Sequence, residues 1–143
     1  MGRLDNKCAL VTGSSAGIGR AVALRLAGEG ARIALSGLNK NAGALLAEEI
    51  NSSGGDACYL KLDVTSENSW SAAMGYIDKT FTRLDILVNN AGITMSGKIE
   101  EMALENWRRI MAVNVEGVFL GTKYAIPLMR RSGGGSIINL SSV

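Results

Sequence analysis

The chain has 143 residues, of which 47% are hydrophobic and 20% are charged, the balance of a globular domain large enough for its own core. Lysine and arginine exceed aspartate and glutamate by only two, 15 against 13, so neither nucleic acid nor a membrane surface is indicated as a partner. No apolar run reaches the length of a membrane span and no signal-peptide core follows the first residues, which makes the cytoplasm the expected location.

Short apolar runs alternate with helical patterns along the chain. Strands are expected at 7–12, 32–36, 57–62, 85–88 and 136–140. Helices are expected at 17–29, at 39–52, from a cap at Thr65 or Ser66 to about 81, and at 104–131, where Pro127 predicts a bend or an early end. This alternation is typical of βαβ units, so the expected fold class is α/β, a doubly wound parallel sheet.

Three of these helices carry apolar stripes that should face the sheet. The stripes are Ile18, Val22 and Leu26; Ala42, Leu45, Leu46 and Ile50; and Trp70, Ala73, Met74, Ile77 and Phe81. The two cysteines fall in the first and third strands, which such a sheet separates by a second strand. We therefore expect Cys8 and Cys58 to lie roughly 9–10 Å apart, too far for a disulfide, and to be buried.

A glycine-rich turn joins the first strand to the first helix. Gly13 can adopt the positive φ of a sharp turn, while Gly17 and Gly19 leave room where a side chain would block a ligand or the sheet. The free N–H groups and the dipole of the helix suit a pyrophosphate, which indicates a dinucleotide-binding Rossmann fold. Ser15 lies in the same turn and belongs to this candidate cofactor site; the alternative is a glycine-rich turn without a ligand.

The end of the second strand, Ser36-Gly37-Leu38, lies where an acidic residue would hold the ribose of NAD. No carboxylate is present, so nothing repels a 2′-phosphate, although no arginine is present to bind one either. Ser36, Asn39 and Lys40 could supply hydrogen bonds. We take all three residues of the strand end as cofactor candidates and favour NADP over NAD; the alternative is a loop tip unrelated to the cofactor.

The next two strands also end in candidate residues. Asp63, followed by Val64, could accept a hydrogen bond from an adenine amino group or cap the following helix, and the local sequence favours capping. Asn90, Ala91 and Gly92 form an abrupt turn, which would lie at the ligand-binding crevice of such a sheet.

Two further candidates are polar, and the absence of histidine limits what they can do, because it excludes a Ser-His-Asp triad and any histidine-ligated metal; no metal is expected. Asn114 shares an apolar stripe with Trp107, Met111 and Val118, and is either a structural amide bonded to backbone or part of an opened helix turn that holds a water. Ser142, at the end of the fifth strand, is a turn residue or a hydroxyl that orients a substrate oxygen.

Together these motifs resemble the short-chain dehydrogenase/reductase family. The matching segments are Thr12-Gly13-x-x-x-Gly17-Ile18-Gly19, Asp63-Val64, Asn89-Asn90-Ala91-Gly92, Asn114-Val115 and Ser141-Ser142. The resemblance implies an NAD(P)-dependent oxidoreductase that transfers a hydride between the nicotinamide cofactor and a small alcohol or ketone. It also implies a homo-oligomer, a dimer or tetramer, formed through the 104–131 helix and the next one.

The resemblance assigns a role to each candidate. The pyrophosphate is lined by Gly13, Gly17, Ile18 and Gly19; the adenine is met by Asp63 and Val64, in place of capping; and the adenosine ribose runs along Asn90, Ala91 and Gly92. Ser142 would orient the substrate oxygen, and Asn114 would hold a water in a proton relay.

One family motif, the Tyr-x-x-x-Lys acid/base, is missing. The tyrosines Tyr59, Tyr76 and Tyr124 are followed four residues later by Asp63, Thr80 and Leu128. The expectation is therefore a single Rossmann domain at 1–143, truncated after its fifth strand, incomplete at its carboxyl end and inactive alone. The alternative is a non-catalytic nucleotide-binding or interaction fragment, while the glycine spacing argues against a sugar-nucleotide epimerase.

Two features bear on association. Gly117, Gly121 and Ala125 form a row of small residues that would allow another helix to approach closely. The apolar fifth strand, 136–140, should leave an unpaired sheet edge.

Overall fold

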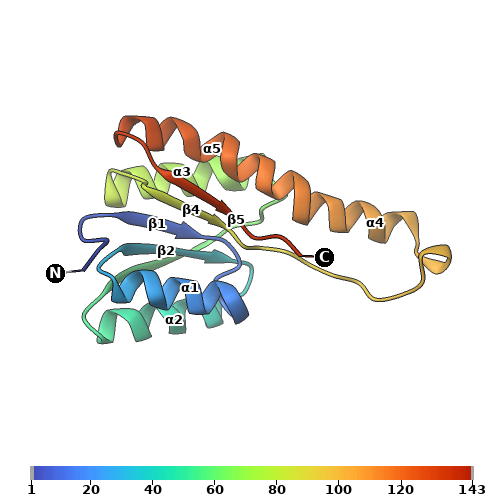
Figure 1. Cartoon of the computed structure of the whole chain (residues 1–143), viewed down its shortest axis with the longest axis horizontal. Helices are drawn as coiled ribbons and strands as arrows, with labels where there is room; N and C mark the ends of the chain where they lie inside the picture. Colours follow the sequence, from blue (N-terminus) through green and yellow to red (C-terminus); the bar gives the residue numbers. More distant parts are fainter. Residues whose placement is uncertain (1, 143) are drawn as a thin grey trace.

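A computed structural model describes residues 2–142 of the chain. Its sheet consists of β1 (Cys8–Val11), β2 (Arg32–Gly37), β3 (Asp56–Lys61), β4 (Ile86–Asn89) and β5 (Ser136–Asn139). All four neighbouring pairs are parallel, and the strand order is β3-β2-β1-β4-β5. The chain moves outward from β1 first to one side and then to the other, so the expected doubly wound Rossmann sheet is confirmed (Figure 1).

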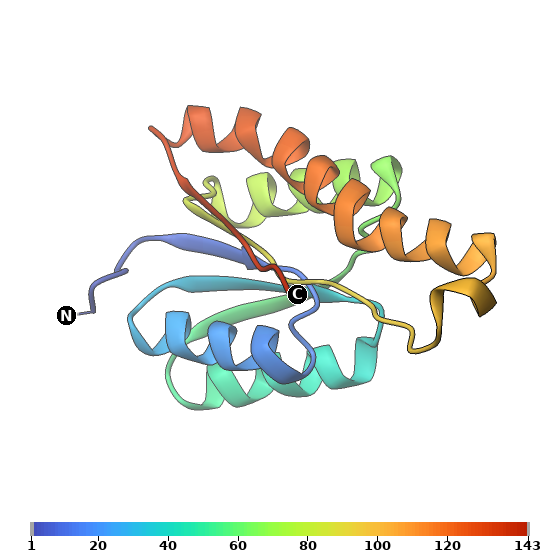
Figure 2. The same cartoon turned by 45° about the vertical axis from the view of Figure 1, so that its right-hand side comes forward.

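Helices cover both faces of this sheet (Figures 1 and 2). One face carries α1 (Gly17–Gly28) and α2 (Lys40–Ser52), and the other carries α3 (Glu67–Phe81) and a long helical rod. The rod comprises α4 (Leu104–Met111), the π-helical turn η2 (Ala112–Glu116) and α5 (Gly117–Arg131), after the short 3-10 helix η1 (Ile99–Glu101). Two apolar clusters fill the space on either side of the sheet. β1 contributes to both clusters and is fully buried, which fixes the centre of the domain.

The stripe expected for α3 is confirmed, because Trp70, Ala73, Met74, Ile77 and Phe81 are all buried. Ser66 is the N-cap of this helix, and its side chain accepts a hydrogen bond from the backbone N–H of Ser69. The rod does not end early at Pro127, since α5 continues to Arg131.

The stripes expected for α1 and α2 are wrong at one residue each. Ile18 is 65% exposed, because it lies in the first turn of α1, while Val22 and Leu26 do pack against the core. Leu45 is 66% exposed, and the buried face of α2 is formed by Gly43, Leu46, Ala47 and Ile50.

The row of small residues in α5 faces inward, so the helix that approaches it is α3 of the same domain and not a helix of a second copy. A Cβ at Gly117 would lie 2.9 Å from Val64, and one at Gly121 would collide with Asn89 and lie 2.9 Å from the Trp70 ring. Ala125 is fully buried. The row therefore lets α5 approach α3 and the sheet within the domain.

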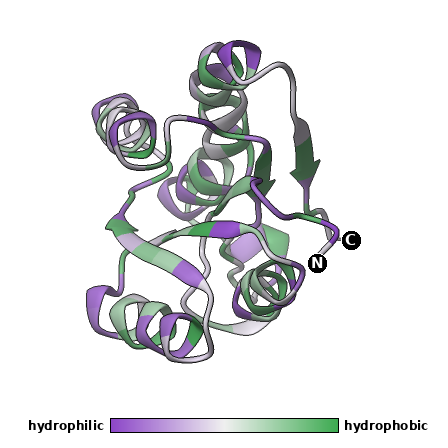
Figure 3. Cartoon of the chain, turned by 90° about the vertical axis from the view of Figure 1, so that its left-hand side faces the viewer, coloured by the Kyte–Doolittle hydropathy of each residue, from purple (hydrophilic) through white to green (hydrophobic). Residues whose placement is uncertain are grey.

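The outer face of the rod and the strand β5 remain uncovered in the described residues. Trp107, Val115 and Phe119 are exposed along the rod, Phe119 to 63%. β5 pairs only with β4, and Figure 3 shows its hydrophobic colouring at the edge of the sheet. The expected apolar edge is thus present, as is an apolar face beside it. Within residues 2–142, no helix combines the length and hydrophobicity needed to cross a membrane.

Candidate functional site

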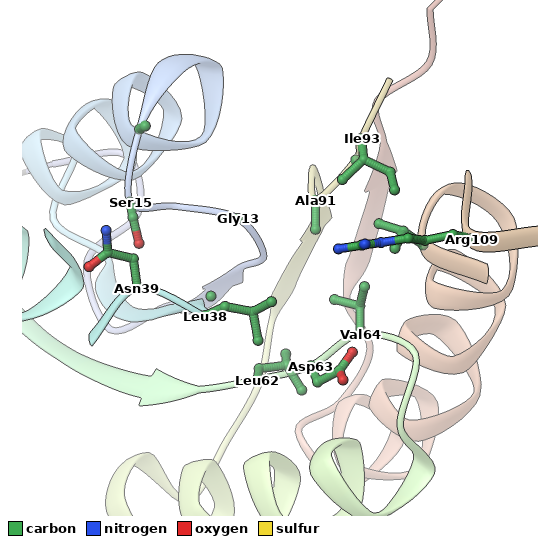
Figure 4. Close-up of a pocket in the computed structure, with 14 residues that line it drawn as sticks. Gly13, Ser15, Leu38, Asn39, Leu62, Asp63, Val64, Ala91, Ile93 and Arg109 are labelled. Atoms are coloured by element: carbon green, nitrogen blue, oxygen red, sulfur yellow. The ribbon is translucent and has the colours of Figure 1, made fainter. Parts of the chain in front are cut away.

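A cavity of about 310 Å³ opens at the carboxyl ends of β1 to β4 (Figure 4). The loops after these four strands and one face of the rod form its wall. The lining residues are Gly13, Ser15, Ala16, Gly37, Leu38, Asn39, Leu62, Asp63, Val64, Ala91, Gly92, Ile93, Arg109 and Val113. The cavity lies where the chain direction reverses between β1 and β4, the usual ligand-binding crevice of such sheets.

The glycine-rich turn has the backbone that its sequence predicts. Gly13 has a φ of 61° and Gly17 a φ of 55°, both in the left-handed region that favours glycine. A Cβ at Gly17 would meet nothing within 4 Å, so the space beside it is open. The N-cap of α1, Ala16, offers no side-chain acceptor, and the first turn holds no acidic residue. The N-terminus of α1 can therefore receive an anion.

Thr12 and Asn90 hold this turn in place. The hydroxyl of Thr12 accepts hydrogen bonds from the backbone N–H groups of Asn90 and Ala91, at 3.0 and 2.9 Å. The side-chain amide of Asn90 donates to the carbonyls of Thr12 and Gly13, at 2.9 and 3.1 Å. A side chain at Gly19 would collide with this amide and with the Gly13 carbonyl. Gly19 thus makes room for the protein itself, and Asn90 acts as a positioning residue.

Three serines where the turn meets β2 play different parts. The hydroxyl of Ser14 donates to the Ser36 carbonyl and accepts from the Ser36 N–H. Ser36 is fully buried, and its own hydroxyl donates to the Val11 carbonyl, so this side chain points into the sheet and away from the cavity. Ser15 lines the cavity, and its buried hydroxyl has no hydrogen-bond partner among the described residues. A buried hydroxyl without a partner is costly, which suits a ligand that would complete it.

The part of the cavity between the ends of β2 and β3 and the rod is mainly apolar. Leu38, Val64 and Val113 line it, and Asp63 supplies a carboxylate (Figure 4). Oδ1 of Asp63 accepts from the N–H and the hydroxyl of Thr65, at 2.9 and 2.7 Å. Asp63 therefore shapes the turn before α3, while the cap itself is Ser66. An apolar region with one acceptor suits a flat, polar-edged base.

Asn114 lies at the centre of the π-helical turn and ties the rod to the end of β4. Its Oδ1 accepts from the Ile93 N–H and its Nδ2 donates to the Ile93 carbonyl, both at 2.8 Å. The amide of Asn114 is therefore bonded to backbone, as one of the two interpretations of the sequence expects, and the helix turn around it is widened.

The structure brings eight of the sequence candidates into one cavity wall: Gly13, Ser15, Gly37, Leu38, Asp63, Val64, Ala91 and Gly92. The other candidates lie outside the wall: Gly17, Ile18, Gly19, Ser36, Asn90, Asn114 and Ser142. Of the other lining residues, the sequence analysis named Asn39 as a source of hydrogen bonds and missed five: Ala16, Leu62, Ile93, Arg109 and Val113. The sequence offers one signal that could have found Val113 and Arg109: they stand one and five positions before Asn114 on the same helical rod.

The remaining reactive groups do not form a second centre in the described chain. Both cysteines are free; Cys8 is buried, as expected, whereas Cys58 is only half-buried. Burial raises the pKa of the Cys8 thiol to about 12 and that of Cys58 to about 11, so both thiols are protonated at neutral pH. No group of three histidine, cysteine, aspartate or glutamate side chains in residues 2–142 is placed to hold a metal ion.

Known proteins match this chain along nearly its whole length. The family model for short chain dehydrogenases matches residues 7–143. A 2,5-dichloro-2,5-cyclohexadiene-1,4-diol dehydrogenase of Sphingobium indicum is 44% identical over 99% of this chain and 56% of its own length. A cyclopentanol dehydrogenase of a Comamonas strain is 44% identical over 100% of this chain and 57% of its own length.

A solved structure matches the fold equally well. The crystal structure of a short-chain type dehydrogenase/reductase from Mycobacterium marinum superposes with a TM-score of 0.93 at 38% identity. The match covers 97% of this chain and 57% of that one. The chain belongs to the short-chain dehydrogenase family and spans a little over half the length of the relatives it matches.

Proposed function

We propose that the chain is the cofactor-binding part of an NAD(P)-dependent dehydrogenase that interconverts an alcohol and a ketone. The observation that carries this proposal is the cavity at the ends of β1 to β4, where an uncapped helix N-terminus meets the unpartnered hydroxyl of Ser15. These features fit the two charged phosphates and the ribose hydroxyls of a dinucleotide. Bound NAD(P) would supply a nicotinamide that accepts or gives a hydride.

The cavity wall and the turns next to it would hold that cofactor together. The N–H groups at Gly17, Ile18 and Gly19 would face the pyrophosphate, while Ser15 and Gly37 would meet the adenosine ribose. Leu38, Val64 and Val113 would enclose the adenine, and Asp63 would accept from its amino group. The backbone of Asn90, Ala91 and Gly92 would pass along the cofactor.

The cofactor we favour is NADP. Gly37 ends β2 without a carboxylate, so no fixed negative charge opposes a 2′-phosphate at this corner. The side chains of Leu38 and Asn39 flank the same corner (Figure 4).

The proposed substrate is a secondary alcohol carried on a small ring. The support comes from two relatives, which are named for a cyclohexadiene diol and for cyclopentanol. Ser142 would orient the substrate oxygen. Asn114, whose amide is committed to Ile93, would act through the widened turn by placing a water.

We further propose a cytoplasmic homo-oligomer, a dimer or tetramer, built on this single domain. The exposed apolar residues Trp107, Val115 and Phe119 support an interface along the rod, because removing their side chains from water is favourable.

The test is turnover by the full-length protein with cyclopentanol and either NAD or NADP, followed by the absorbance of the reduced nicotinamide. We expect the cofactor to be reduced only when the alcohol is present, and NADP to be preferred over NAD. Binding of a dinucleotide without turnover of any cyclic alcohol would favour the non-catalytic alternative. Failure to bind either dinucleotide would contradict the proposal as a whole.

A further inference from the structure

Arg109 is the one basic residue among those that line the cavity. Its side chain extends from α4 into the cavity, on the side opposite Gly13 and Ser15 (Figure 4). In the part of the chain that the structure describes, its guanidinium makes no hydrogen bond and no ion pair. Arg109 is an exposed residue, so it is presented to the cavity with its hydrogen-bond donors free.

Apolar side chains share the cavity wall with Arg109. Val113 follows one turn later on the same rod, and Val64 and Ile93 line the same cavity. Asp63 is the carboxylate of this wall, but it lies beyond ion-pair distance and its Oδ1 is already bonded to Thr65. The position thus lacks the fixed anion that normally explains an arginine at such a site.

We propose that Arg109 closes the adenine slot by stacking its planar guanidinium on the exposed face of the base. The proposal rests on the function proposed above and adds a specificity-determining residue to it. Arginine stacks on aromatic faces through its delocalised, weakly hydrated cation, which a point charge such as lysine reproduces poorly. The phosphates would lie across the cavity, at the N-terminus of α1 and the corner of Ser15 and Gly37, so they do not account for this side chain.

The test measures binding of 5′-AMP to the full-length protein by titration calorimetry. Arg109→Leu should weaken AMP binding by about two- to fivefold, the effect of losing a cation–π contact at an exposed site. Arg109→Lys should stay close to the leucine variant, because the charge remains but the plane is lost. The matched control is Arg108→Leu, which changes a neighbouring exposed arginine outside the cavity wall and should bind like wild type. Nicotinamide mononucleotide should bind equally to all variants.

Three outcomes would overturn the proposal: Arg109→Leu binds AMP like wild type, Arg109→Lys restores binding fully, or the loss appears only with 2′,5′-ADP. The last two would assign Arg109 to a phosphate. Thermal unfolding shows whether each variant folds, and Arg109→Gln replaces the leucine variant if that one does not. A wild-type protein that binds no AMP would sink the proposed function as well, whereas normal wild-type binding with an unaffected Arg109→Leu would sink this inference alone.

Discussion

Two neighbouring serines in the glycine-rich turn separate folding from binding. Ser14 is fully buried and exchanges two hydrogen bonds with the backbone of Ser36, which joins the turn to β2. Ser15 holds a buried hydroxyl without a partner and faces the cavity. The first hydroxyl joins the turn to the sheet, while the second is the one that we propose a ligand would complete.

Replacing each serine by alanine tests this division. Ser14→Ala should lower the free energy of unfolding by about 1–3 kcal/mol, because it leaves backbone groups of Ser36 without their buried partner. Ser15→Ala should leave that free energy unchanged or slightly higher, and should weaken dinucleotide binding by roughly three- to tenfold. Denaturant unfolding and calorimetric titration measure the two effects. Equal losses of stability in both variants would refute the ligand role of Ser15.

Gly37, which ends β2, leaves no charge at the corner where we propose that the ribose binds. A Cβ there would lie 3.3 Å from the Ser15 hydroxyl, close but short of a collision with backbone. Gly37→Asp should therefore fold, and should shift the preference toward NAD by about 1–3 kcal/mol through repulsion of the 2′-phosphate and hydrogen bonds to the ribose. The affinities for NAD and NADP give the shift directly.

Gly37→Asn is the matched control, since it has the same shape without the charge. It should move the preference much less than Gly37→Asp. A wild-type protein that already prefers NAD would show that the proposed cofactor choice is wrong.

The packing of α5 depends on a glycine that the sequence suggested for another purpose. Gly121 lies against Asn89 and the Trp70 ring, so even a methyl group must displace them. We expect Gly121→Ala to destabilise the domain by about 1–3 kcal/mol through overpacking. Gly75→Ala is the control in α3: a Cβ there meets nothing within 4 Å, and removing a mid-helix glycine should stabilise by roughly 0.5–1 kcal/mol. A stable Gly121→Ala variant with weakened self-association would restore the original interpretation.

Element types and order could be read from the sequence because the signals are local. The apolar stripe from Trp70 to Phe81 keeps helical spacing, and the glycine-rich turn marks the end of the strand before it. The rotation of α2 could not be read, because it depends on Gly43, where the helix backbone approaches the Tyr59 ring so closely that no Cβ would fit. Hydrophobic periodicity favours Leu45, but close approach through a glycine turns that leucine outward.

The candidate site could be predicted on the side built by short motifs. Gly13, Asp63 and Ala91 follow strands whose ends must meet at one edge of a parallel sheet. The opposite wall comes from the rod, whose position relative to that edge is set by the packing of Gly117 and Gly121. Arg109 reads as an ordinary charged helix residue until that packing places it over the cavity.

For the molecule as a whole, Asp85 joins the amino-terminal ends of three strands, at the end of the sheet away from the cavity. Its carboxylate accepts from both Nε and a terminal nitrogen of Arg83, at 2.7 and 2.6 Å, and from the backbone N–H of Cys8 at 2.9 Å. Its carbonyl accepts from Ser136 at 2.8 Å, so strands β1, β4 and β5 begin around one residue. Burial opposes the charge, but the bonds from Arg83 and Cys8 prevail and hold the pKa of Asp85 below its usual 3.8.

This lowered pKa predicts a pH dependence. A carboxylate whose pKa is lower in the folded state stabilises the fold at any pH above its pKa in the unfolded state. That contribution is lost as the pH falls through its pKa in the folded state. The stability difference between wild type and Asp85→Asn should thus be constant near neutral pH and shrink as the pH falls below 3.8. Thermal unfolding across this range measures it, and parallel profiles would contradict the assigned role.

A nicotinamide dinucleotide bound in the cavity at the ends of β1 to β4 should shield the loops that form its wall. Hydrogen–deuterium exchange of the full-length protein with and without saturating NADP measures this shielding. We expect slower exchange at 13–19, 37–39, 62–64 and 91–93, with little change around Asp85 at the other end of the strands. Unchanged exchange in those four loops, or protection confined to another surface, would contradict binding of the dinucleotide at this site.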